Sequence, residues 1–251
     1  ILKRYGKARL ITATNVFAHI DNVEDVMKNI NKLLDKNGFF ISESHYLVEL
    51  IKTVQYDTIY HEHMRYYSLT SLSYLFKKYN LKIFYAKKIQ THGGSIRVYV
   101  SKNKNQKVHS SVKKILQYEK KFLNEKTFES FKEKVIKSKI NLYALLKSLK
   151  NKKKVIYGVG APSRAATLVN YVGLNEDIIN CILEIKGSYK IGKYMPGTNI
   201  PILNENIINK KKPDYLLILS WHIADFLIKN FKKKGYKGKF IIPLPEPYIL
   251  G

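Results

Sequence analysis

Residues 155–171 read VIYGVGAPSRAATLVNY and decide the fold of the C-terminal part of the chain. The apolar run Val155–Tyr157 predicts a short buried strand, residues 158–161 predict a tight glycine turn, and residues 163–171 have helical periodicity. Further apolar runs at 179–183 and 215–219 predict two more strands. Strands that alternate with helices build an α/β sheet, so this part is expected to be a Rossmann-like α/β domain.

The turn at residues 158–161 has two readings. Its backbone N–H groups and the positive end of the following helix suit a phosphate, with Arg164 as a nearby cation and Glu184 placed after the next strand to bind a ribose. The third glycine of the dinucleotide fingerprint is absent. A turn that needs glycine only for steric reasons explains the same residues equally well.

The N-terminal part also alternates strands and helices. A helix is expected at 23–34, closed by residues 36–38, and a second one begins after Ser68 as N-cap and ends at Asn80. Strands are expected at 10–13, 39–43, 81–87 and 95–101.

A lysine-rich segment from about Ser110 to Lys150 is helical in pattern throughout and predicts one or two connecting helices. Its apolar stripe contains Phe131, Val135, Leu142, Leu145, Leu146 and Leu149. With 251 residues, the chain has room for two domains. The expected divisions are 1–105, 106–153 as a helical connector, and 154–251.

Composition restricts the partners and the compartment. The formal net charge is +26, but only five of the 45 basic residues are arginines and no aromatic-basic binding module is recognisable, so no nucleic-acid partner is expected. No apolar stretch is long enough to cross a bilayer. The single cysteine, Cys181, favours a reducing compartment, and we expect a cytoplasmic protein.

Residues 60–63, Tyr-His-Glu-His, are the densest cluster of ionisable side chains. A histidine beside a glutamate is the minimum equipment of a general base. His61 and His63 without an HExxH pattern make a metal site a weaker reading, and no metal ligands are assigned in this chain. A hydrogen-bonded surface loop remains the alternative. His19, His92 and Trp221 each stand at the end of an expected strand or beside glycines, where ligands of α/β sheets bind.

Together these segments resemble one family, the S-adenosylmethionine-dependent C-methyltransferases that methylate a ring carbon of a nucleotide-linked keto-deoxysugar. The resemblance covers nearly the whole chain. It rests on five segments in order: 13–20 (ATNVFAHI), 57–63 (DTIYHEH), 92–97 (HGGSIR), 157–164 (YGVGAPSR) and 190–198 (KIGKYMPGT). The family also carries an N-terminal zinc-binding segment and a glycine-rich donor loop, neither of which is seen here. We therefore expect a fragment that lacks its true N-terminus, with zinc and most of the donor site upstream of it.

The resemblance implies a fold and a set of roles. The fold would be a partial class I methyltransferase Rossmann-like sheet, a helical connector and a second Rossmann-like domain. His63 would be the base, Glu62 would orient it, and Tyr60 and His19 would hydrogen-bond the sugar or its enolate. The diphosphate would be held by Arg164, Lys190 and the turn amides. The full set of expected substrate-binding residues is His92, Gly93, Arg97, Gly158, Gly160, Ala161, Ser163, Arg164, Glu184, Lys190 and Trp221.

Two other functions remain open on the sequence. An O- or N-methyltransferase of a related glycan precursor would need no proton abstraction from carbon. A non-catalytic nucleotide-sugar-binding module would need no methyltransferase chemistry at all. The sequence leaves the sugar, the ring carbon, the nucleobase and the oligomeric state open.

Overall fold

The computed structural model describes residues 2–251, and the chain divides into two compact units. Unit 1 contains residues up to Lys52 and residues 61–130, whereas unit 2 contains residues 53–60 and 131–251. The chain therefore enters unit 2 briefly, at Thr53–Tyr60, and returns to unit 1. Contiguous domains with boundaries at residues 105 and 153 were expected from the sequence. That prediction did not include a segment at residues 53–60 that belongs to the C-terminal unit.

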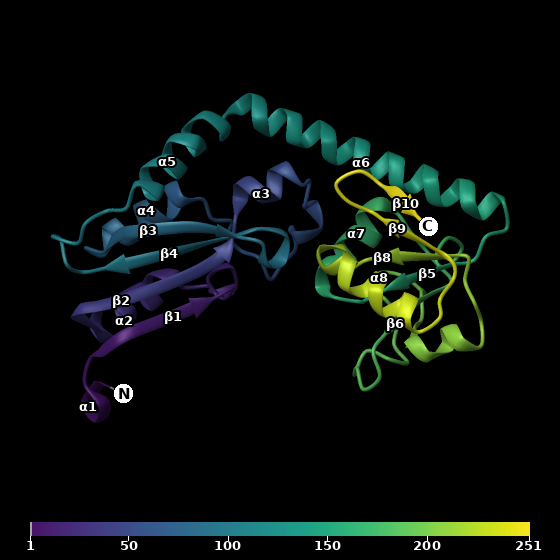
Figure 1. The fold of residues 1–251 in the computed structure, drawn as a ribbon, viewed down its shortest axis with the longest axis horizontal. Coiled ribbons are helices and arrows are strands. Elements are labelled where there is room, and N and C mark those ends of the chain that lie inside the picture. The colour runs from purple at the N-terminus through teal and green to yellow at the C-terminus, as the bar shows by residue number, and fades with distance from the viewer. Residues whose placement is uncertain (1) are drawn as a thin grey trace. The chain divides into compact units, whose positions relative to one another are not determined.

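Unit 1 is built on a four-stranded mixed sheet (Figure 1). Its order is β1-β2-β4-β3, with β1 and β2 parallel and β4 antiparallel to both of its neighbours. The elements are α1 (Leu2–Tyr5), β1 (Ala8–Thr14), η1 (Phe17–His19), α2 (Val23–Leu33), β2 (Leu34–His45), α3 (Leu47–Lys52), α4 (Leu69–Lys78), β3 (Lys82–Ile89), η3 (Thr91–Gly93), β4 (Ser95–Ser101) and α5 (Ser110–Phe122).

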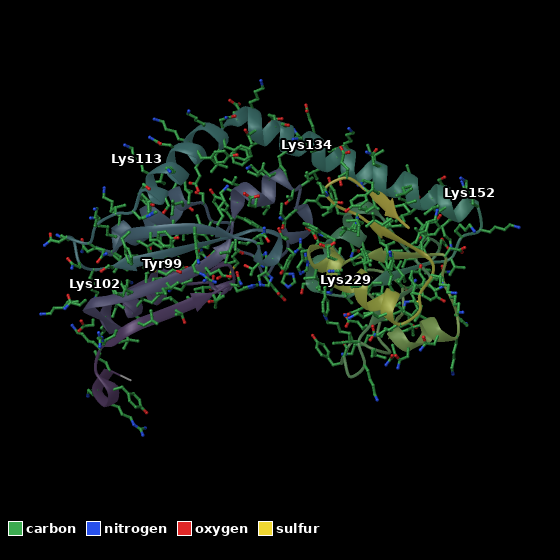
Figure 2. All side chains as sticks on the ribbon, in the orientation of Figure 1. Tyr99, Lys102, Lys113, Lys134, Lys152 and Lys229 are labelled. Carbon is green, nitrogen blue, oxygen red and sulfur yellow. The ribbon has the colours of Figure 1, made fainter. Side chains whose placement is uncertain are left out.

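One face of this sheet forms the core of unit 1. Phe40 is fully buried there, 5.8 Å from the ring of Phe17 and 5.8 Å from the ring of Phe76 on α4. The opposite face carries Phe39 and Tyr99, which each contact the ring of Phe84 and are only partly covered; Tyr99 is labelled in Figure 2. The period-two alternation of the strands separates these two faces.

Helix boundaries follow the expected capping signals, with one exception. Ser68 is the N-cap of α4, as predicted, and the structure adds a capping box with Ser71. The prediction that residues 36–38 close the preceding helix is wrong, because this helix, α2, already ends at Leu33. Residues 35–38 form a bulge in β2, because Ala8 pairs with Leu34 while Leu10 pairs with Phe39.

The connector consists of two helices, α5 and α6 (Glu125–Asn151). Leu123 and Asn124 separate them, and the Asn124 side chain accepts a hydrogen bond from the Thr127 N–H at 3.0 Å. The predicted apolar stripe is confirmed, since Leu142, Leu146 and Leu149 of α6 are buried in the core of unit 2. Figure 2 labels Lys113 on α5, Lys134 on α6 and Lys152 just after α6, and all three side chains are exposed.

Unit 2 is a three-layer α/β domain, which confirms the expected fold class. Its sheet has the order β10-β9-β8-β5-β6-β7 and is parallel except for β10. Its elements are η2 (Tyr56–Thr58), β5 (Ile156–Val159), α7 (Ser163–Val172), β6 (Cys181–Glu184), β7 (Ile202–Asn204), η4 (Glu205–Asn209), β8 (Tyr215–Ile218), η5 (Trp221–Ile223), α8 (Ala224–Lys233), β9 (Lys239–Ile242) and β10 (Tyr248–Leu250). Alternate strand residues pack toward α6 and α7 on one face and toward α8 on the other.

Strand β5 is longer than the sequence predicts, which moves the glycine turn. Gly158 lies inside the strand, and a Cβ atom there would come within 2.9 Å of Ile182 and 3.0 Å of Leu219. The turn therefore comprises residues 160–162. Because β5 pairs with β6 on one side and with β8 on the other, the loops after β5 and β8 flank the point where strand order reverses, which is where open α/β sheets bind ligands.

No helix among residues 2–251 is both long and apolar enough to cross a membrane.

Candidate functional site

A buried carboxylate lies beside the loops after β5 and β8 in unit 2. Asp57, on the short turn η2, has no exposed surface. Its two oxygens accept hydrogen bonds from Arg164 Nε at 2.7 Å and Arg164 Nη2 at 2.9 Å. Trp221 Nε1 donates to the same carboxylate at 2.8 Å. The Asp57 carboxylate thus accepts three charge-assisted hydrogen bonds.

Arg164 is therefore occupied by the protein itself. Its guanidinium also lies 4.9 Å from the centre of the Trp221 ring, and Nη1 is 3.3 Å from His222 Nδ1. Of its five N–H groups, three have partners. The sequence predicts that Arg164 binds a phosphate and that Trp221 contacts the substrate. The structure brings both side chains to Asp57.

The turn amides are also engaged. Gly160 N–H donates to Leu183 O at 2.9 Å, and Ala161 N–H donates to Glu184 Oε1 at 2.7 Å. Lys190 Nζ donates to Ala161 O at 2.6 Å. Glu184 and Lys190 thus close the turn from two sides. Glycine is required at residue 160, because φ is +84° and a Cβ atom would lie 2.4 Å from Ser220 Oγ.

A pocket of about 270 Å³ opens beside this turn, at the start of α7. Ser163 is exposed at the first position of α7, where backbone N–H groups have no partner inside the helix. Lys190 and Lys193 bring positive charge to the pocket wall, and Lys193 Nζ lies 5.4 Å from the ring centre of the exposed Tyr189. The remaining lining residues are Ala161, Pro162, Ala166, Tyr194, Met195, Pro196 and Ile202. The pocket combines cations, aromatic rings and a helix N-terminus.

Unit 1 has its own cluster at the carboxyl ends of β1 and β2. Glu43 is 3% exposed and accepts from Arg97 Nε at 2.9 Å and Arg97 Nη2 at 2.6 Å. Thr91 Oγ1 donates to it at 3.1 Å, and Asn15 N–H donates to Glu43 O at 2.8 Å. The hydrogen bonds from Arg97 to Glu43 raise the pKa of the Arg97 guanidinium above its ordinary value. Arg97, expected to bind substrate, here neutralises a buried acid.

The same cluster anchors the loop that contains His92 and Gly93. Thr91 begins the short helix η3, and His92 adopts φ +56° next to it. His92 is exposed and Gly93 is half-buried. Both residues thus lie in a loop tied by Thr91 to the carboxyl end of β2.

Two histidines meet at the carboxyl end of β1. The ring centres of His19 and His63 are 4.8 Å apart, and the ring of Tyr66 is 6.3 Å from His63. Arg65 holds the His63 segment in place by donating to Ile20 O and, at 2.9 Å, to Asp21 O. The structure therefore brings together two of the four side chains expected to be catalytic.

The other two side chains are placed differently. Glu62 is exposed, and its Oε1 lies 4.0 Å from His61 Nε2. Tyr60 is half-buried and is the last residue of the unit 2 segment, so the Tyr60–His63 signature begins in unit 2 and continues in unit 1. Within residues 2–251, no group of three His, Cys, Asp or Glu side chains could hold a metal ion.

Sequence reasoning missed Asp57, Glu43 and Arg65. Asp57 is part of the segment 57–63 that carried the resemblance, but no role was assigned to it. The sequence signal that could have indicated Glu43 is its place as a single acid at the end of an apolar strand. For Arg65, the only such signal is its position two residues after His63.

Comparisons with known proteins agree with this architecture. Residues 90–245 match the family described as C-methyltransferase C-terminal domain, and residues 1–86 match a methyltransferase domain. The C-methyltransferase NovU of Streptomyces niveus is 34% identical over 256 residues, which cover 100% of this chain and 60% of that protein. The chain thus spans about three fifths of the length of the curated relative it matches. Since the C-terminal domain match alone covers more than half of the chain, the chain belongs to the C-methyltransferase family.

Proposed function

We propose that the intact protein transfers a methyl group to a carbon next to the ketone of a deoxysugar carried on a nucleoside diphosphate. The observation that carries this proposal is the His19–His63 pair at the carboxyl end of β1, in a chain of the C-methyltransferase family. C-methylation needs a base to remove a proton from carbon. The imidazoles of this pair lie at the carboxyl end of β1, where they are well placed to act as that base.

The chemistry follows from the acidity of the substrate. A carbon next to a ketone loses a proton because the resulting charge spreads onto the carbonyl oxygen, so the enzyme needs a base and donors for the oxyanion. His63 takes the proton, and His19 and Tyr60 hydrogen-bond the sugar or its enolate oxygen. Arg65 ties the segment that contains His63 to the loop after β1 and so limits the motion of the base.

S-adenosylmethionine is the methyl donor implied by the family; when bound, it supplies an electrophilic methyl group on a sulfonium. The described residues of unit 1 fit part of such a site, because Asn15 and Phe17–His19 follow a parallel strand at its carboxyl end. No glycine-rich turn joins a strand to a helix among the described residues of unit 1, so these residues do not complete the donor site.

The nucleotide diphosphate is assigned to the pocket beside α7. Arg164 and the amides of Gly160 and Ala161 already have partners within the protein. Lys193, the remaining donors of Lys190 and the first amides of α7 are the groups that can meet the phosphates. Tyr189 and Tyr194 offer exposed rings for a base or sugar to stack on.

We also infer a reducing, cytoplasmic setting. Cys181 is buried in β6, and burial raises the pKa of its thiol to about 12, so it stays protonated and inert.

Solvent deuterium exchange tests the proposal. In the intact protein, with S-adenosylmethionine omitted, a thymidine-diphosphate-linked keto-deoxysugar should exchange the proton next to its ketone, and His63→Ala should slow this exchange by about 100-fold or more. His61→Ala is the matched control, because its side chain is 88% exposed and only two residues away. Exchange that is unaffected in folded His63→Ala would show that His63 is not the base. If no exchange is seen and the protein, once supplied with S-adenosylmethionine, methylates oxygen or nitrogen, C-methylation would be contradicted.

A further inference from the structure

The Asp57 carboxylate joins three segments that are distant in sequence. It lies on η2, while its donors come from the first turn of α7 after β5 and from the loop after β8. These two loops flank the position where strand order reverses in unit 2. The carboxylate thus fills a place where α/β sheets commonly bind an anionic ligand.

Stability alone does not account for this arrangement. Replacing a buried ion pair by apolar side chains is often neutral or stabilising, so such a pair is weak evidence of a purely structural role. The segment 53–60 is already anchored by apolar packing, since Val54 and Tyr56 are buried in the core of unit 2 and the ring of Tyr56 lies 5.1 Å from that of Tyr171. What the ion pair adds is direction, because two parallel N–H groups of Arg164 fix the orientation of the carboxylate.

A short, hydrogen-bonded stretch joins Asp57 to Tyr60. Thr58 N–H donates to Gln55 O at 3.1 Å, and Ile59 N–H donates to Tyr56 O at 3.0 Å. Thr58 Oγ1 also donates to Gln55 O at 2.8 Å. Tyr60 is the next residue, so little freedom remains between the clamped carboxylate and the tyrosine.

We propose that Asp57 is a positioning residue, which uses Arg164 and Trp221 to set the place of Tyr60 in unit 2. The proposal rests on the proposed function, in which the Tyr60 hydroxyl hydrogen-bonds the sugar or its enolate. Asp57 itself is fully buried, so its carboxylate is not open to a substrate. Its contribution is therefore expected in kcat and not in the KM for the methyl donor.

A double-mutant cycle separates positioning from simple destabilisation. In the intact protein, Asp57→Asn should lower kcat on a keto-sugar nucleotide by about 10-fold or more, with the KM for S-adenosylmethionine within about twofold of wild type. If Asp57 acts through Tyr60, adding Asp57→Asn to Tyr60→Phe should lower kcat no further. Losses that multiply in the double variant, or wild-type kcat in folded Asp57→Asn, would overturn the proposal.

Asp214→Asn is the matched control. Asp214 also lies in unit 2 and pairs with Lys154 at 3.0 Å, far along the chain from Tyr60. This variant should lose thermal stability without losing kcat. If Asp57→Asn does not fold, Trp221→Phe removes only one donor to the carboxylate and keeps the ion pair, and the same cycle with Tyr60→Phe applies to it.

Amide hydrogen exchange gives an answer that needs no turnover. Asp57→Asn should speed exchange at Ile59 and Tyr60 while Val54 and Tyr56 stay protected by their apolar packing. Unchanged exchange at Tyr60 would contradict the positioning role. A wild-type protein that turns over no keto sugar would count against the proposed function alone, since the exchange measurement still decides on Asp57.

Discussion

The imidazole rings of His19 and His63 lie edge to face, with their centres 4.8 Å apart, although the two residues are 44 positions apart in sequence. His19 is placed by the short helix η1 directly after β1. His63 is placed by the segment that follows the excursion into unit 2. Their meeting depends on contacts between the two loops.

Arg65 supplies the strongest of these contacts, so its removal should impair the pair. Arg65→Met loses the hydrogen bonds to Ile20 O and Asp21 O, while the Met64 N–H bond to Ala18 O at 3.0 Å remains. Hydrogen bonds from charged donors contribute about 1.5 to 3 kcal/mol, so turnover should fall by about 10- to 100-fold if that energy holds His63 in place. The loss of turnover is measured by steady-state kinetics of the intact protein.

Arg65→Lys serves as the comparison for this prediction. Lysine keeps the charge but reaches only one carbonyl at a time, so it should recover part of the activity. Equal activity of both variants and wild type would mean that Arg65 does not hold His63 in place for the reaction.

The pocket beside α7 should bind a nucleoside diphosphate through Lys193. Its side chain is exposed and lines the pocket, so Lys193→Ala removes a cation without disturbing the turn. The affinity for thymidine diphosphate should fall by about 10-fold, and the loss should shrink at high salt because the charges are screened. Calorimetric titration at two salt concentrations provides the measurement.

Lys229→Ala is the control for the pocket, because Lys229 is exposed on α8 and does not line it. Equal affinities of the two variants would place the diphosphate elsewhere. Arg164→Ala is a poor test of phosphate binding, since it also leaves the Asp57 carboxylate buried and unpaired.

The contrast between Arg164 and α2 shows what the sequence could and could not predict. Helix α2 was predicted nearly to the residue, because Val23, Met27 and Ile30 repeat at helical spacing. These signals are local. Arg164 pairs with Asp57, which is 107 positions away in sequence. Neither hydrophobic periodicity nor a turn signal predicts such a pair.

The unexpected bulge in β2 has the same origin. Residues 36–38 carry a local turn signal, and Asn37 N–H does bond to Asp35 Oδ1 at 2.9 Å. Pairing with β1 converts this turn into a bulge within a longer strand. Local signals gave the elements of the fold, while the pairing of side chains in the candidate site depends on tertiary contacts.

Glu43 should make unit 1 sensitive to the loss of Arg97. The Glu43 side chain is 4% exposed, whereas the Arg97 side chain is 35% exposed, so Arg97→Met leaves a carboxylate buried without its cation. We expect the free energy of unfolding to fall by about 3 kcal/mol, measured by urea denaturation of the intact protein.

The double variant Arg97→Met/Glu43→Gln should be more stable than Arg97→Met alone, because the uncompensated charge is then removed. Lys28→Met, which breaks the exposed pair with Asp25, should leave the denaturation midpoint unchanged. A double variant less stable than Arg97→Met would contradict the assignment of the cost to the buried carboxylate.

Asp214 should contribute stability that depends on pH. The Val155 N–H donates to Asp214 Oδ2 at 2.8 Å and, with Lys154, holds the pKa of this carboxyl below its ordinary value. A carboxyl whose pKa is lower in the folded state stabilises the fold above its unfolded pKa, near 3.9, and this stabilisation disappears as pH falls through the folded value. Because the side chain is 37% exposed, solvent screening limits the effect at neutral pH to about 1 kcal/mol. The melting temperatures of wild type and Asp214→Asn should therefore differ at pH 7 and converge below about pH 4. A difference in melting temperature that stays constant down to pH 3 would show that the lost stability does not come from the ionised carboxylate.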